Sequence, residues 1–194
     1  SSRRGLDTRV NEALQSLHAW LCELEGSERV EKPVTQSDAR ALDDLLEVLW
    51  GAATDAEAKS LLEPRFRSLV NPFFLQSATL RRTFEKPRGY AGDYLMMEAL
   101  YRNTPEGDTP LARWMDEWAL ALPGFAAVRF RCRLLADLLR AEHARGARRV
   151  LSVACGSARE LTDTAHLDFE SVDLLDQDGD AIQAASRGIF EAAG

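Results

Sequence analysis

The hydrophobic pattern over the first 146 residues has the period of an α-helix. Apolar residues recur every three or four positions over 6–25 and over 37–51, and this spacing predicts two amphipathic helices. Five further helical segments are expected, at 55–64, in short pieces within 65–84, after Asp93, at 109–122 and at 123–144. The N-terminal part of the chain is therefore predicted to be all-helical.

Residues that start and stop helices set the expected bounds. Thr54-Asp-Ala-Glu57 has the spacing of a capping box, which opens a helix. Gly51 and Gly146 are expected to end helices, and Pro64 is expected to end or kink one. The charged segment 27–34 is predicted to be a loop.

The pattern changes after residue 146. Val150, Leu151, Val153 and Ala154 form a short apolar run, which is typical of a strand buried on both faces. Small residues follow, then a helical stretch, and then a second apolar strand that ends at Leu175. We expect an α/β fold, in which a helical region (1–146) precedes the start of a Rossmann-like parallel sheet (147–194).

Composition narrows the class of protein. The chain has 194 residues and a net charge of -7, so a nucleic-acid partner would gain no general electrostatic attraction. The three cysteines are far apart in apolar surroundings, which favours a reducing, cytoplasmic location. No cluster of Cys and His suggests zinc, and no apolar run approaches the length of a membrane span.

Residues 85–101 carry an unusual density of polar and aromatic groups. Pro87, Gly89 and Gly92 predict a loop rich in turns, and Asp93 is placed to cap the helix that follows. Loops of this kind on a rigid scaffold often line binding sites, although tyrosines that merely pack between helices would explain the composition equally well.

The turn after the first strand, here called the glycine turn, carries the clearest chemical signal. Residues 155–158 are all small, so a ligand can approach the backbone and the first N–H groups of the next helix. Asp176 follows Gly156 by twenty positions, the spacing at which an acidic side chain meets ribose hydroxyls in nucleoside-binding α/β folds.

Three cofactor classes use such turns, and the sequence discriminates among them. The phosphate-cradling motif GxxxxGK[ST] is missing. The dinucleotide motif GxGxxG falls on Ala154, Gly156 and Arg159, so two of its three glycines are lost. S-adenosylmethionine carries no phosphate and needs a tight turn and an acid for its ribose, which Gly156 and Asp176 supply. A βαβ unit that binds no cofactor is the remaining alternative.

The segment Val150-Leu-Ser-Val-Ala-Cys-Gly-Ser-Ala-Arg-Glu-Leu161 resembles motif I of class I S-adenosylmethionine-dependent methyltransferases, and Leu174-Leu-Asp-Gln-Asp-Gly-Asp-Ala-Ile182 resembles their second motif. Together with Lys86-Pro-Arg-Gly-Tyr-Ala-Gly-Asp-Tyr-Leu-Met-Met, the chain is similar over about 65–190 to bacterial 3-hydroxypalmitate methyl ester biosynthesis proteins. The resemblance implies methyl transfer to a small molecule, with a fatty-acid-like or natural-product carboxylate as the acceptor.

The resemblance also implies which residues form the site. The cofactor would be held by the glycine turn, the start of the next helix and the end of the second strand, at Ala154, Cys155, Gly156, Ser157, Glu160, Asp176, Gln177 and Asp178. A lid that orients cofactor or acceptor would use Arg88, Tyr90 and Tyr94, and Arg88 would pair with a carboxylate. A carboxylate acceptor needs no base, whereas for a hydroxyl or amine acceptor Asp93 or Glu160 is the candidate base.

Two features keep other functions open. Ser152, Ala154 and Ala158 replace an acid and two glycines of the family pattern. The chain also stops before the later strands of the fold, so we expect an open sheet with exposed apolar side chains, completed by a homodimer or a second chain. The alternatives are a non-catalytic helical interaction module with a degenerate nucleoside-binding fold, and an NAD(P)-dependent oxidoreductase.

Overall fold

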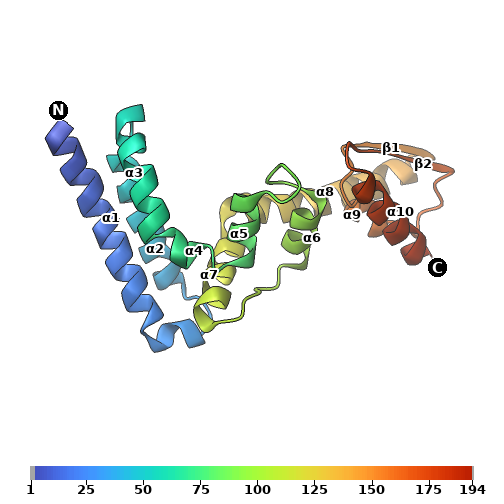
Figure 1. Ribbon diagram of the computed structural model, residues 1–194. Helices are drawn as coiled ribbons and strands as arrows, with labels where there is room; N and C mark the ends of the chain where they lie inside the picture. The colour runs from blue at the N-terminus through green and yellow to red at the C-terminus, as the bar shows by residue number, and fades with distance from the viewer. Residues whose placement is uncertain (1–2, 194) are drawn as a thin grey trace. The chain divides into compact units, whose positions relative to one another are not determined.

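The computed structural model describes residues 3–193, with side chains from residue 7 onward, and is mostly helical (Figure 1). The described residues form two compact units. One unit contains those up to Phe84 together with Pro105–Ala119, and the other contains Glu85–Thr104 together with those from Leu120 onward. The elements in chain order are α1 (Arg3–Glu25), η1 (Glu28–Glu31), α2 (Gln36–Ala52), α3 (Ala56–Leu69), α4 (Asn71–Phe74), α5 (Ala78–Glu85), α6 (Tyr94–Arg102), α7 (Pro110–Ala121), α8 (Pro123–Ala144), β1 (Arg149–Val153), α9 (Arg159–Thr162), β2 (Ser171–Leu175) and α10 (Gly179–Ala193).

The core of the first unit is formed by the apolar stripe of α1. Its members recur at helical spacing and are buried against α2 and α3, as the three adjacent helices in Figure 1 show. The buried residues of this stripe are Val10, Leu14, Leu17, Leu21 and Leu24. The predicted helical periodicity over 6–25 is therefore confirmed for the side chains that the structure describes.

A buried carboxylate links α5 and α7. Asp116 on α7 is 1% exposed and accepts hydrogen bonds from Ser77 Oγ at 2.6 Å, Thr79 N at 2.8 Å and Glu106 N at 2.9 Å. Three donors satisfy a charge whose burial would otherwise be costly. This carboxylate therefore holds the start of α5 and the 103–109 loop against α7.

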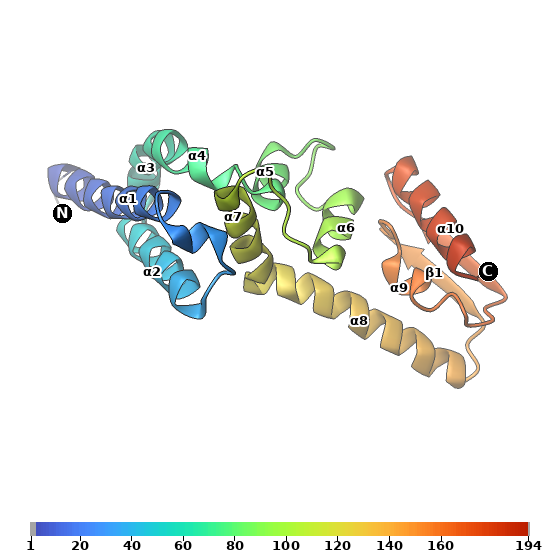
Figure 2. The same cartoon turned by 90° about the horizontal axis from the view of Figure 1, so that it is seen from below.

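The second unit contains the sheet. Strands β1 and β2 pair in parallel, with Val150 opposite Val172 and Val153 opposite Leu175. One face of the sheet packs on α8, α9 and α10, which lie beside it in Figure 2. The apolar side chains of this core are Leu139, Val150, Cys155, Ala158, Leu161, Val172, Leu174, Ile182, Ala185 and Ile189.

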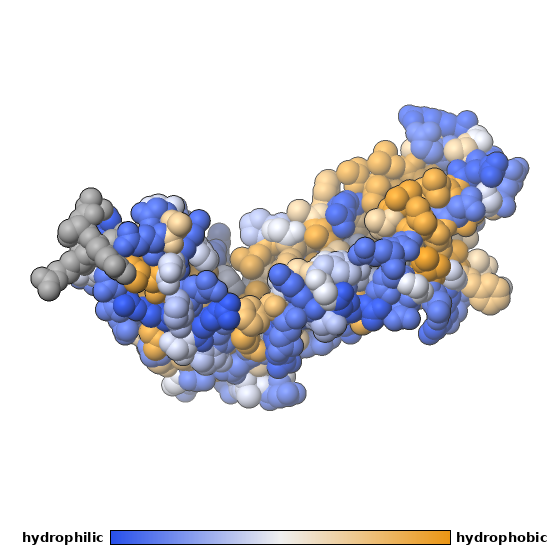
Figure 3. Space-filling model, turned by 45° about the horizontal axis from the view of Figure 1, so that its top comes forward, coloured by the Kyte–Doolittle hydropathy of each residue, from blue (hydrophilic) through white to orange (hydrophobic). Residues whose placement is uncertain are grey.

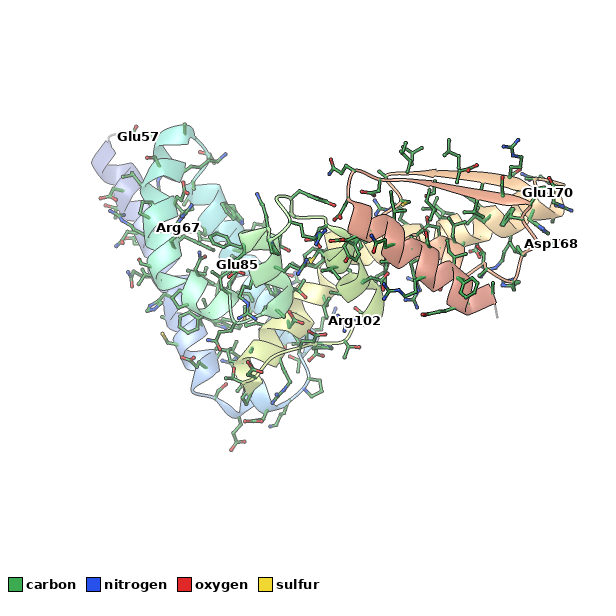
Figure 4. The ribbon with its side chains drawn as sticks, turned by 45° about the vertical axis from the view of Figure 1, so that its right-hand side comes forward. Glu57, Arg67, Glu85, Arg102, Asp168 and Glu170 are labelled. Atoms are coloured by element: carbon green, nitrogen blue, oxygen red, sulfur yellow. The ribbon has the colours of Figure 1, made fainter. Side chains whose placement is uncertain are left out.

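The other face of the sheet is exposed. Leu151, Val153 and Leu175 are 67%, 63% and 57% exposed. Figure 3 shows apolar surface gathered over the part of the molecule that contains the strands. Figure 4 shows the side chains on this face projecting away from the helices. The prediction of a strand buried on both faces is therefore wrong, because within residues 3–193 no helix covers this side. The expected exposure of apolar side chains on an open sheet is confirmed.

The predicted long helix over 123–144 is confirmed, and so is its end at Gly146, whose φ is +101°. Four other local predictions need correction. Asp55, not Thr54, caps α3, since its Oδ1 accepts from Ala58 N at 2.8 Å. Helix α2 runs through Gly51 to Ala52, and α3 continues past Pro64 to Leu69. The segment predicted as a loop over 27–34 contains the short helix η1. In α2 and α3 the packing of neighbouring apolar residues outweighs one residue's preference, whereas η1 buries no residue and is capped by Ser27.

Candidate functional site

Three residues of the glycine turn have left-handed backbone conformations. Ala154, Gly156 and Ala158 have φ of 55°, 53° and 47°. Alternating left-handed residues let the chain leave β1 and enter α9 within five residues. Glycine adopts this conformation freely, whereas alanine is strained there. Ala154 and Ala158 therefore have a backbone conformation that favours glycine while carrying an alanine side chain.

Asp176 joins this turn to the end of β2. Its Oδ2 accepts a hydrogen bond from Gly156 N at 2.8 Å, and its Oδ1 accepts one from Asp178 N at 2.9 Å. Cys155 N continues the ladder by donating to Leu175 O at 3.1 Å. Gly156 and Asp176, which are twenty positions apart in the sequence, are therefore in direct contact, and this contact shapes the turn.

A cleft of about 960 Å³ lies beside the turn, within the second unit. Its volume is in the range of small-molecule sites. Its lining residues come from β1, the glycine turn and the end of β2, and from α6, α8 and α9. Nine predicted site residues line it, namely Tyr90, Tyr94, Ala154, Cys155, Gly156, Ser157, Glu160, Asp176 and Gln177.

Arg88 and Asp178, which the sequence assigned to separate tasks, pair with each other. Arg88 Nε and Nη2 donate to the two carboxylate oxygens of Asp178 at 2.7 and 2.6 Å, and Nη2 also meets Asp180 Oδ2 at 2.8 Å. The guanidinium also lies 5.2 Å from the ring centroid of Tyr94. The hydrogen bond from Arg88 holds the pKa of Asp178 below its usual value. These two residues border a second hollow, of about 670 Å³, with Tyr90 and Gln177.

Asp93 lies away from the cleft wall. It is fully buried and caps α6, where its Oδ1 accepts from Leu95 N at 3.0 Å and Met96 N at 3.2 Å. The predicted cap is confirmed. A carboxylate that closes a helix and is shielded from solvent is poorly placed to take a proton from a ligand, so Glu160 is the better placed of the two candidate bases.

Tyr90 and Glu160 have perturbed proton affinities. Burial raises the pKa of Tyr90, and the carboxylates of Asp176 and Asp178 raise it further, whereas a hydrogen bond with Gln177 lowers it. Burial likewise raises the pKa of Glu160, while its own backbone amide and the charge of Arg131 lower it. Perturbed groups on the wall of a cleft are typical of functional sites.

Glu98 holds the glycine turn against α6, and sequence reasoning missed it. Its Oε1 accepts from Ser157 Oγ at 2.5 Å, and its Oε2 lies 3.5 Å from Arg159 Nη1. Ser157 is 9% exposed, so its hydroxyl points into the protein toward Glu98. A polar residue between Met96, Met97 and Leu100 on an otherwise apolar stretch of α6 was the available signal.

Tyr101 and Arg131 were also missed as cleft residues. Tyr101 is on α6 and Arg131 is on α8, and both line the cleft. Arg131 lies in an arginine-rich stretch of α8, and no local motif marks it as different from its neighbours.

Cys155 is suited to packing rather than to attack on a ligand. It is 9% exposed, and burial raises the pKa of its thiol, with a further contribution from Asp176. A nucleophilic cysteine needs a stabilised thiolate, which this environment disfavours.

No family model matches this chain, and no curated protein and no solved structure matches it. Among residues 3–193, no helix combines the length and the apolar character needed to cross a membrane. The same residues contain no group of three or more His, Cys, Asp or Glu side chains arranged to hold a metal ion.

Proposed function

We propose that this chain binds S-adenosylmethionine beside the glycine turn and directs its methyl group to a small molecule. The observation that carries the proposal is the hydrogen bond from Gly156 N to Asp176 Oδ2 at the edge of the 960 Å³ cleft. This contact brings the turn and the acidic strand end together, which suits a nucleoside that carries no phosphate.

The residues of the turn fit such a cofactor. Residues 154–158 have short side chains, so a ligand can reach the backbone. Each carboxylate oxygen of Asp176 accepts one backbone hydrogen bond and has a second lone pair for a ribose hydroxyl. The sulfonium of the cofactor would supply an electrophilic methyl group; the chain's own task is to orient the acceptor and exclude water.

The acceptor decides whether the chain must also move a proton. A carboxylate is already ionised at neutral pH, so orientation alone suffices. A hydroxyl or amine acceptor needs a base, and Glu160 lines the cleft with a pKa above its usual value because of burial. The apolar side chains of Leu135, Leu139 and Leu161 on the cleft wall favour an acceptor with a hydrophobic body.

Calorimetric titration with S-adenosylhomocysteine tests the proposal, with NADH as the competing cofactor class. We expect micromolar binding of the first and none of the second. Asp176→Asn should weaken binding about tenfold or more, since the remaining acceptor pairs poorly with ribose. Asp173→Asn, an exposed site on the same strand, is the matched control. Binding of NADH alone, or of neither ligand, contradicts the proposal.

One observation favours the interaction module instead. The exposed apolar side chains Leu151, Val153 and Leu175 lie on one face of the sheet, and apolar surface of this kind often marks a protein contact. If the function is only to bind a partner, Leu151→Asp should abolish that association while Asp176→Asn leaves it intact.

A further inference from the structure

The charged groups of the cleft are few and unevenly placed. Among its lining residues in the described chain, Arg131 is the one cation, and Glu160 and Asp176 are the acids. Asp176 is occupied by two backbone amides. Leu135 and Leu139, one and two turns further along α8, add apolar side chains to the lining.

Arg88 is not available for the role of binding a ligand carboxylate. Both carboxylate oxygens of Asp178 receive hydrogen bonds from its guanidinium, and Asp180 accepts another. A ligand carboxylate would have to displace a bidentate intramolecular pair, which offsets most of the gain from binding. The cation that faces the main cleft is a different one.

Arg131 and Tyr101 line the same cleft from two helices that pack together, α8 and α6. Tyr101 is half-buried, and Arg131 is close enough to lower the pKa of its phenol against the larger effect of burial, which raises it. An arginine has five N–H donors, and a single hydroxyl leaves most of them for a ligand. Glu160 is close enough for the charge of Arg131 to act on it, but the described chain places no carboxylate within ion-pair distance of this guanidinium.

We propose that Arg131, positioned by Tyr101, forms a carboxylate-binding subsite in this cleft. The inference rests on the proposed function for the identity of its ligands. Two molecules in the reaction carry a carboxylate, the amino-acid end of the cofactor and a carboxylic acid acceptor. The guanidinium fork suits either one, and the apolar side chains of Leu135 and Leu139 on the same helix would lie beside the hydrophobic part of the ligand.

Titrations with two pairs of ligands test the subsite. S-adenosylhomocysteine is compared with 5′-methylthioadenosine, which lacks the amino-acid carboxylate, and 3-hydroxydodecanoate is compared with its methyl ester. Arg131→Gln should weaken one carboxylate ligand about tenfold or more and leave its carboxylate-free counterpart within about twofold. Loss for the first pair assigns the carboxylate to the cofactor, and loss for the second pair assigns it to the acceptor.

Further variants separate recognition from folding. Arg133→Gln removes the same charge from an exposed position on the same helix and should change neither pair. Tyr101→Phe should weaken the same ligand as Arg131→Gln, and the double variant should lose no more than Arg131→Gln alone, because Tyr101 acts through Arg131. Arg131→Lys should restore part of the affinity, since it keeps the charge without the fork.

The outcomes distinguish this subsite from the proposed function. If wild type binds 5′-methylthioadenosine and Arg131→Gln binds both carboxylates normally, the nucleoside site stands and the subsite is wrong. If wild type binds neither nucleoside but Arg131→Gln loses the fatty acid, the subsite stands and the cofactor assignment is wrong. Equal loss with Arg133→Gln, or no binding of any of the four ligands, overturns the subsite.

Discussion

The carboxylate of Asp176 lies 2.8 Å from the backbone nitrogen of Gly156, across the ends of two parallel strands. The residue that the sequence assigned to a ribose is therefore also the residue that shapes the turn. A ligand role and a structural role at one carboxylate have separable consequences, because only the structural role affects the stability of the chain without ligand.

Asp176→Ala should lower the free energy of unfolding by about 1–3 kcal/mol, since two backbone amides lose a charged acceptor. Asp176→Asn should lower it less, because its side-chain oxygen still accepts one of the two hydrogen bonds. Urea denaturation measures both changes. Asp173→Asn, at an exposed position, should stay within about 0.5 kcal/mol of wild type. Equal stability of all three variants would show that the contact contributes nothing.

Substitutions at Ala154 and at Gly156 should change the free energy of unfolding in opposite directions. Ala154 is exposed with φ +55°, so Ala154→Gly should raise the free energy of unfolding by about 0.5–1 kcal/mol, the relief of strain less the added entropy of the unfolded chain. Gly156→Ala should lower it by a similar amount. A Cβ at Gly156 would lie 3.9 Å from Tyr94 Cβ, so strain rather than collision is responsible. Thermal unfolding of both variants checks the signs.

Glu160 should make the chain less stable as the pH rises. Burial raises its pKa above the usual 4.5, so the folded state binds the proton more tightly than the unfolded state does. Stability is therefore lost as the pH increases from 4.5 through the raised pKa. Glu160→Gln should be more stable than wild type at pH 7, and the difference should shrink toward pH 4. A difference that is constant with pH would contradict a titrating Glu160.

The pair of Arg88 and Asp178 should have the opposite pH dependence. The hydrogen bond from Arg88 lowers the pKa of Asp178 below its usual 3.8, so the stabilisation is present above pH 3.8 and is lost as the pH falls through the lowered pKa. A double-mutant cycle with Arg88→Gln and Asp178→Asn should show coupling at pH 7 that decreases below pH 3.8. Coupling that persists in strong acid would exclude an ionic pair.

The three cysteines should differ in their reactivity toward a thiol reagent at pH 8. Cys22 is exposed, whereas burial raises the pKa of Cys132 to about 11 and raises that of Cys155. We expect one thiol to react rapidly with Ellman's reagent in the folded protein and all three to react in urea. Cys22→Ser should remove the rapid phase, and rapid reaction of a second thiol would show that the buried sites open readily.

Much of the local structure could be predicted because neighbouring residues encode it. Pro123 and Gly146 mark the bounds of α8, and Asp93 caps α6 through amides two and three residues away. The second strand ends at Leu175, as its apolar run indicates, and the acid that follows it contacts the glycine turn. These features depend on hydrogen bonds and periodicities that span a few residues or one βαβ unit.

The sequence by itself determined the helical pattern, the two strands and nine of the residues around the cleft. The tertiary structure alone decided which charges meet. Arg88 pairs with Asp178 from 90 positions away, and Arg131 reaches the same cleft wall as Tyr101 from another helix. It also decided which face of the sheet is exposed. Periodicity reports which side of an element is apolar, whereas pairing of distant charges and coverage of a face depend on how elements pack.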